Sequence, residues 1–78
     1  MARFYFDIRH GEALAVDEEG LDLHSQRAAE IEAALSLADI ARELDPRASS
    51  EDLVIEVRDT NSVVVRATFI LEKARLIN

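Results

Sequence analysis

The sequence predicts an α+β fold of order β-β-α-β-β, an antiparallel four-stranded sheet with one helix packed on one face. Residues 3–9 alternate apolar and polar side chains, which is typical of a half-buried strand. Residues 24–45 have helical spacing, and 53–58 and 63–72 are apolar runs on either side of a short turn. A chain of 78 residues has room for one domain, so we expect residues 1–78 to form a single domain.

The first hairpin joins residues 3–9 to a strand at 13–17 through a turn at His10-Gly11. A two-residue turn would set Ile8 opposite Ala13. A three-residue loop would set Ile8 opposite Leu14, and Phe6 opposite Val16. The longer loop puts the large apolar side chains on one face, so we favour it.

The segment DEEGLDL, residues 17–23, leads into the helix. Gly20 is expected to supply a turn position with positive φ. Leu21 and Leu23 are expected to lie under the sheet edge.

The helix is expected to begin after Ser25, whose hydroxyl can accept a bond from an early backbone N–H, and to stop before Pro46. One apolar stripe is suited to pack on the sheet: Ala29, Ala33, Leu37, Ile40 and Leu44. A second contains Ala28, Ile31, Ala34, Leu35 and Ala38, bordered by Arg27 and Arg42. It is either part of a broad, alanine-rich core face or a contact for a second copy or another protein.

The second hairpin has a register that hydrophobicity decides. A three-residue loop, 60–62, pairs Val57 with Val65, Ile55 with Ala67 and Leu53 with Phe69. A two-residue loop would bury Arg66. Asn61 is suited to a left-handed conformation. The face toward the helix would then contain Val63, Val65, Ala67, Phe69 and Leu71.

The predicted core combines the inward side chains of the strands with the first helix stripe. It comprises Phe4, Phe6, Ile8, Leu14, Leu37, Ile40, Leu44, Leu53, Ile55, Val57 and Phe69.

Composition argues against nucleic acid and membrane as direct partners. The net charge is −7 and the sequence pI is about 4.6, which disfavours direct binding to nucleic acid. The sequence has no long apolar run for a membrane span and no signal-peptide core at its N-terminus. With no cysteine either, we expect a cytoplasmic protein.

No pattern indicates catalysis, a cofactor or a metal. The acidic run of Asp17, Glu18, Glu19 and Asp22 lacks the ligand spacing of a calcium loop, so we interpret it as a structural turn. His10 and His24 have no adjacent nucleophile or Gly-rich phosphate loop. We therefore expect no enzyme, and rank last a catalytic role for Arg9, His10 and the acidic run.

Two apolar surfaces are candidates for association, since so small a domain is marginally stable alone. One is the outer sheet face with Tyr5, Val54, Val64 and Ile70, and the other is the helix stripe with Ile31 and Leu35. We expect a homodimer and favour the flatter sheet face.

Phe6-Asp7-Ile8-Arg9 with Gly11, followed by Asp17 and Gly20 before an alanine-rich helix, resembles a short bacterial family of uncharacterised domains. The resemblance covers nearly the whole chain but implies no activity. A second likeness, of fold alone, is to HicB-type antitoxins, in which two strands also lead into an amphipathic helix.

Two functional hypotheses follow. The first is a small, non-catalytic protein-interaction module that forms a homodimer. The alternative is an antitoxin-like regulator that neutralises a basic partner protein, since opposite charge speeds the encounter of two proteins.

Overall fold

A computed structural model describes residues 1–44 and 52–71. It confirms the α+β class and the antiparallel sheet with a single helix packed on it. The sheet has five strands rather than the four expected, because residues 21–23 form an additional short strand. The elements in chain order are β1 (Ala2–His10), β2 (Ala13–Ala15), β3 (Leu21–Leu23), α1 (Gln26–Glu43), β4 (Leu53–Arg58) and β5 (Val63–Phe69).

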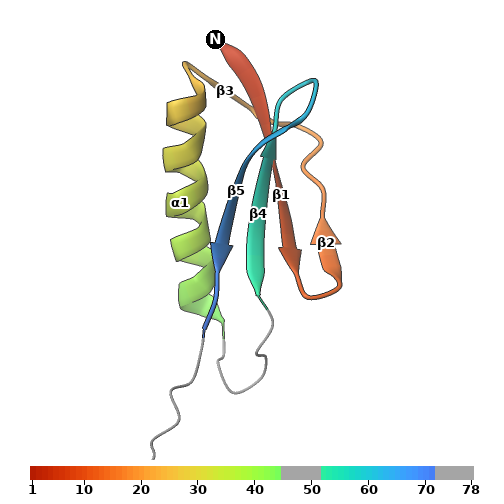
Figure 1. Cartoon of the computed structure of the whole chain (residues 1–78), viewed down its shortest axis with the longest axis vertical. Helices are drawn as coiled ribbons and strands as arrows, with labels where there is room; N and C mark the ends of the chain where they lie inside the picture. Colours follow the sequence, from red (N-terminus) through yellow and green to blue (C-terminus); the bar gives the residue numbers. More distant parts are fainter. Residues whose placement is uncertain (45–51, 72–78) are drawn as a thin grey trace, which may run out of the picture.

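The sheet has the order β2-β1-β4-β5, and β3 pairs with β1 on the same side as β2. All pairs are antiparallel. Helix α1 packs against β4 and β5 and touches β3, so it lies toward the β5 side of the sheet (Figure 1). None of the described residues forms a helix on the opposite face of the sheet, here called the outer sheet face.

The first hairpin has a different register from the one we expected. His10 lies opposite Ala13, and Arg9 lies opposite Leu14, which leaves a two-residue loop of Gly11 and Glu12. Gly11 has φ 61°, and a glycine with positive φ at the first loop position is the signature of a type II′ hairpin turn. The turn therefore set the register, and it left Leu14 and Val16 exposed instead of buried.

The segment before the helix pairs with the sheet instead of lying beneath its edge. In β3, Leu21 lies opposite Phe4, and Leu23 lies opposite Ala2. Leu23 packs against the core while Leu21 is exposed. Gly20 has the positive φ we predicted, at 74°.

The helix begins as predicted, with the Ser25 hydroxyl accepting a bond from the Ala28 N–H at 3.1 Å. It ends at Glu43, two residues short of the expected end, and the predicted stop at Pro46 lies outside the described residues. Ala29 and Ala33 of the first stripe are fully buried. Ile31, Ala34, Leu35 and Ala38 of the second stripe are exposed, so of its two interpretations the broad core face is wrong.

The second hairpin has the predicted register, with Ile55 opposite Ala67 and Leu53 opposite Phe69. Its turn differs from the expectation. Arg58 lies opposite Val63, and the ladder is irregular beside Val57, which makes Val64 an extra residue on β5. The Asp59 carboxylate accepts the Asn61 and Ser62 N–H groups at 2.7 and 2.8 Å. No non-glycine residue described has positive φ, so Asn61 is not left-handed.

The core lies between α1 and the inner sheet face. Its buried apolar side chains are Phe4, Ala29, Ala33, Leu53, Ile55 and Val57. The predicted residues Phe6, Ile8, Leu37 and Ile40 are partly buried against it, and Leu44 and Phe69 are half-buried. Leu14 is half exposed, at 50%, and is the one predicted core residue that lies on the surface. Val63 and Leu71, expected to face the helix, are also exposed.

Candidate functional site

The densest polar arrangement surrounds Asp17, where the chain passes from β2 to β3. β2 covers residues 8–10 of β1, and β3 covers residues 2–4. In the gap between them the Asp17 carboxylate accepts the Phe6 N–H at 3.1 Å. Its other oxygen accepts the Glu19 and Gly20 N–H groups, each at 3.1 Å. One side chain thus caps its own turn and satisfies a backbone donor that no strand reaches.

Asp7 and Arg58 join this turn to the middle of the sheet. Arg58 Nε donates to Asp7 Oδ2 at 2.8 Å, and Arg58 Nη2 donates to the Asp17 carbonyl, also at 2.8 Å. The Asp17 N–H donates to Asp7 Oδ1 at 2.9 Å. The Asp7 side chain is only 14% exposed, so its charge depends on these donors. We call Asp7, Asp17 and Arg58 the Asp–Arg cluster.

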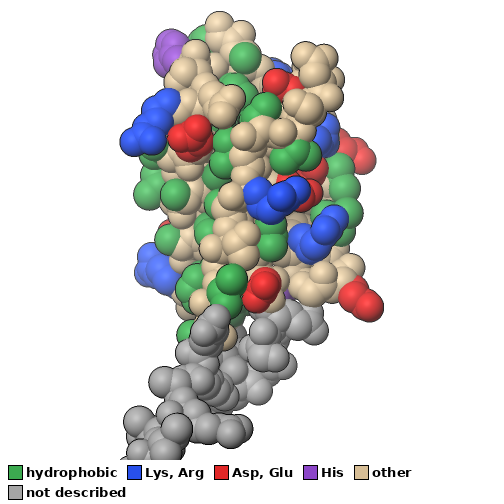
Figure 2. Space-filling view, in the orientation of Figure 1, with side chains coloured by type: hydrophobic (Ala, Val, Ile, Leu, Met, Phe, Trp, Pro, Cys, Tyr) green, Lys and Arg blue, Asp and Glu red, His purple; other side chains and the backbone are tan. Residues whose placement is uncertain are grey.

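Tyr5 and Arg3 extend the polar surface toward β3. The Arg58 guanidinium lies over the Tyr5 ring, 4.6 Å from its centroid. Arg3 pairs with Asp22 at 2.9 Å and also donates to the Glu19 carbonyl. In the view of Figure 2, basic and acidic side chains lie near one another over the sheet.

The cluster favours the charged form of both aspartates. Burial raises the pKa of Asp7, but the hydrogen bonds from Arg58 and the Asp17 N–H outweigh it and hold the pKa below its ordinary value. The N–H of Gly20 has the largest influence on Asp17 and lowers its pKa against the opposing effect of burial, with help from the Phe6 and Glu19 N–H groups.

We expect acid to destabilise the protein through this cluster. A carboxyl whose pKa is lower in the folded state adds stability above its unfolded pKa, about 3.9, and that stability is lost as the pH falls through the folded pKa. The free energy of unfolding should therefore change little from Asp7 and Asp17 above about pH 5, and should fall below about pH 4. Urea unfolding between pH 7 and pH 2.5 measures it.

The Asp17→Asn variant is the matched comparison for the pH series. It should be less stable than wild type at pH 7 and should lose less stability on acidification, because it has one titrating carboxyl fewer. Parallel pH profiles for the two proteins would show that Asp17 makes no such contribution.

The same contacts determine what the Asp–Arg cluster can do chemically. The carboxylate oxygens of Asp7 and Asp17 already accept bonds from the protein. Within residues 1–44 and 52–71, no group of three or more histidine, aspartate or glutamate side chains is placed to hold a metal ion. The cluster is arranged to join β1, β4 and the loop before β3.

Arg9 and His10 lie away from the acidic run. His10 is at the end of β1, opposite Ala13 and Leu53, while Asp17 bonds to Phe6 four residues earlier. Four residues of strand span roughly 13 Å. The arrangement of Arg9, His10 and acidic side chains considered from the sequence is therefore spread along the strand.

The candidate residues of the outer sheet face have different environments. Tyr5 is half-buried beneath Arg58, and Val54 is half-buried on β4. Val64 packs against the core, because the bulge turns it inward, so its predicted place on the outer face was wrong. Ile70, just after β5, is 56% exposed. The centre of this face is more polar than the sequence suggested, since Glu56 also pairs there with Arg66 at 2.8 Å.

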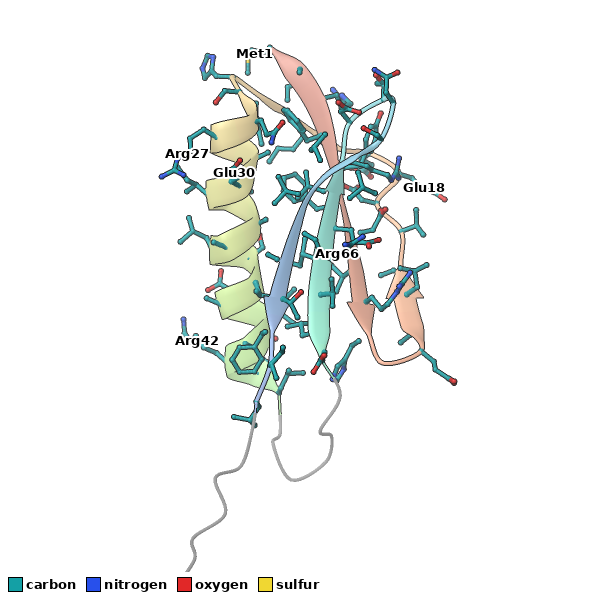
Figure 3. All side chains as sticks on the ribbon, viewed as in Figure 1. Met1, Glu18, Arg27, Glu30, Arg42 and Arg66 are labelled. Atoms are coloured by element: carbon teal, nitrogen blue, oxygen red, sulfur yellow. The ribbon has the colours of Figure 1, made fainter. Side chains whose placement is uncertain are left out.

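The helix candidates are more open. Ile31 is 49% exposed and Leu35 is 60% exposed, one helical turn apart. Arg27 and Arg42, which border this stripe, point away from the sheet (Figure 3). They pair with Glu30 and Asp39 of their own helix, at 3.5 and 3.7 Å.

Sequence reasoning missed the Asp–Arg cluster. It identified the acidic run as a turn but could not assign a partner to Asp17, which is ten residues from Asp7 and 41 from Arg58. The available signal was the outward register position of Asp7 and Arg58, two opposite charges on neighbouring antiparallel strands.

The model of the family described as a domain of unknown function, DUF6894, matches residues 3–70. The chain belongs to this family. No curated protein and no solved structure matches the chain. In the part of the chain that the structure describes, no helix has the length and apolar composition needed to cross a membrane.

Proposed function

We propose that this member of the DUF6894 family is a small, non-catalytic protein-interaction module that forms a homodimer. The observation that carries the proposal is the distribution of apolar side chains. Among the described residues, six apolar side chains are buried and nine large ones are exposed. Each large side chain that association buries fully contributes about 1.5–3 kcal/mol. A second copy of the chain would bury these side chains and so enlarge the small core.

Some of the exposed side chains are neighbours on one element. Ile31 and Leu35 form an open stripe on α1, and Ile70 and Leu71 follow the last residue of β5, while Val63 lies at the other end of that strand. Single apolar residues scattered on a surface need no partner, but groups on one element indicate a contact surface.

Light scattering tests the proposal. At micromolar concentration we expect roughly twice the chain mass of 8.7 kDa, with dissociation on dilution. The unfolding temperature should rise with protein concentration, because the folded dimer is favoured by mass action. A protein that stays at the mass of one chain up to high concentration, with constant unfolding temperature, would refute the homodimer.

The alternative, an acidic regulator that neutralises a basic partner, is favoured by the net charge of −7 alone. Purification of the tagged chain from its native host distinguishes the two proposals. A basic protein recovered in equal amount, and released by salt, favours the regulator. Recovery of untagged copies of the same chain favours the homodimer.

A further inference from the structure

We infer that the open edge of β5 pairs antiparallel with β5 of a second copy, about a two-fold axis at Ala67, so that the two sheets become one. This inference rests on the homodimer proposed above and names the surface that forms it. It differs from the outer sheet face and from the helix stripe, the two surfaces that the sequence had suggested.

One edge of the sheet is covered and the other is open. On one side, β1 is covered by β2, β3 and the Asp17 carboxylate. On the other side, β5 ends the strand order, with no described strand beyond it. Strand edges that avoid association use proline, lysine, bulges or short length. β5 is seven residues long, VVVRATF, and its bulge at Val64 leaves Val65–Phe69 regular.

The hydrogen bonds of β1 determine which N–H and C=O groups of β5 face the open edge. The Phe6 N–H donates to Asp17, on the side of β1 away from β4. Phe6 and Val57, which lie opposite each other, therefore exchange no backbone hydrogen bonds. The backbone N–H and C=O groups of Val57 therefore point toward β5, where Val65 lies opposite Val57. Because direction alternates along a strand, the N–H and C=O groups of Arg66 and Thr68 point to the open edge.

The side chains select the register about Ala67. A two-fold axis there places Arg66 opposite Thr68 of the other copy, and Val65 opposite Phe69. An axis at Arg66 would put two like charges directly opposite each other, which is destabilising. An axis at Val65 would set the exposed Ile70 opposite Thr60. With the axis at Ala67, Ile70 and Leu71 instead run beside the apolar residues Val63 and Val64 of the second copy.

The helix layer agrees with this pairing. Because α1 packs on both β4 and β5, it stands close to the open edge (Figure 1). Neighbouring strands are about 4.8 Å apart, so two helices, each centred between β4 and β5 of its own copy, would lie about 10 Å apart. That is the spacing of directly packed helices, about 8–10 Å. Pairing through β5 therefore extends the sheet and the helix layer together.

Replacing Thr68 by proline tests the edge. Thr68→Pro removes an N–H that faces the open side and none that bonds to β4, so the chain should fold, as edge strands tolerate proline. We expect this variant to have the mass of one chain in light scattering. Thr68→Ala is the matched control: it keeps the N–H, and we expect a dimer. If both variants are dimers while Leu35→Glu is a monomer, the homodimer stands and the β5 edge is not its interface. A wild-type monomer would refute both proposals.

A disulfide at the axis gives a second measurement that does not depend on the proline variant folding. The chain has no cysteine. Opposite residues that exchange no bonds have Cα atoms about 4.5 Å apart, within the disulfide range of about 4.4–6.8 Å. Ala67→Cys should therefore give a covalent dimer on mild oxidation. Val65→Cys should not, because its two copies would be roughly 14 Å apart along the strands. Equal cross-linking of the two variants, or none in either, would overturn the register about Ala67.

Discussion

Replacing Phe4 by alanine is expected to destabilise the fold by about 3–5 kcal/mol, because it removes a buried ring and leaves a cavity. Phe4 is 5% exposed and belongs to the central cluster with Ala29, Ala33, Ile55 and Val57. The helix residues of this cluster are both alanines, so α1 has no larger buried side chain in the cluster to fill the space. A domain of this length has a total free energy of unfolding of about 4–12 kcal/mol, so the substitution would remove much or all of it.

The matched control is Leu14→Ala. Leu14 is half exposed, and substitutions at surface positions change the free energy of unfolding by no more than about 0.5 kcal/mol. Urea unfolding at one fixed protein concentration measures both variants, since dimerisation would otherwise add a concentration dependence. Phe6→Ala should fall between them, because Phe6 is only partly buried. A Leu14→Ala protein as unstable as Phe4→Ala would restore the three-residue loop that the sequence favoured.

The elements that could be predicted from sequence are those decided by hydrophobic periodicity. The register of β4 and β5 follows from apolar residues on one face, because the alternative would have buried Arg66. The start of α1 follows from Ser25. The register of β1 and β2 could not be found in this way, since the β2 residues opposite Ile8 and His10 are alanines, which gain little from burial. The backbone preference of Gly11 decided it instead.

The place of Asp17 in the Asp–Arg cluster was beyond prediction for a different reason. A carboxylate in a turn bonds equally well to solvent, to its own turn or to a distant strand, and no residue pattern distinguishes these. Asp17 reaches the Phe6 N–H only because β2 and β3 are both short and leave that donor uncovered. The contact thus depends on where two strands end, and strand ends are the least predictable part of a fold.

Replacing Gly20 by alanine is the substitution expected to disrupt this cluster most. Gly20 has φ 74°, a conformation that costs a residue with a Cβ about 1–3 kcal/mol. A Cβ there would lie 2.9 Å from Arg3 Cγ and from Tyr5 Cε2, and 3.0 Å from the Phe4 carbonyl oxygen. The carbonyl belongs to β1 and cannot move without disturbing the sheet, so the loop must move instead. Since Asp17 accepts the Gly20 N–H, that movement would also weaken the hydrogen bond from the Phe6 N–H to the Asp17 carboxylate.

We therefore expect Gly20→Ala to lower the free energy of unfolding by at least about 1–3 kcal/mol and to speed hydrogen exchange at the Phe6 N–H. Glu18→Ala, in the same loop but exposed, is the control and should leave both quantities near wild type. Exchange separates this effect from a general loss of stability, because the Phe6 amide should lose more protection than amides that bond between β4 and β5. If Gly20→Ala unfolds as wild type does and the Phe6 amide stays protected, the loop does not close on β1 through Gly20 and Asp17.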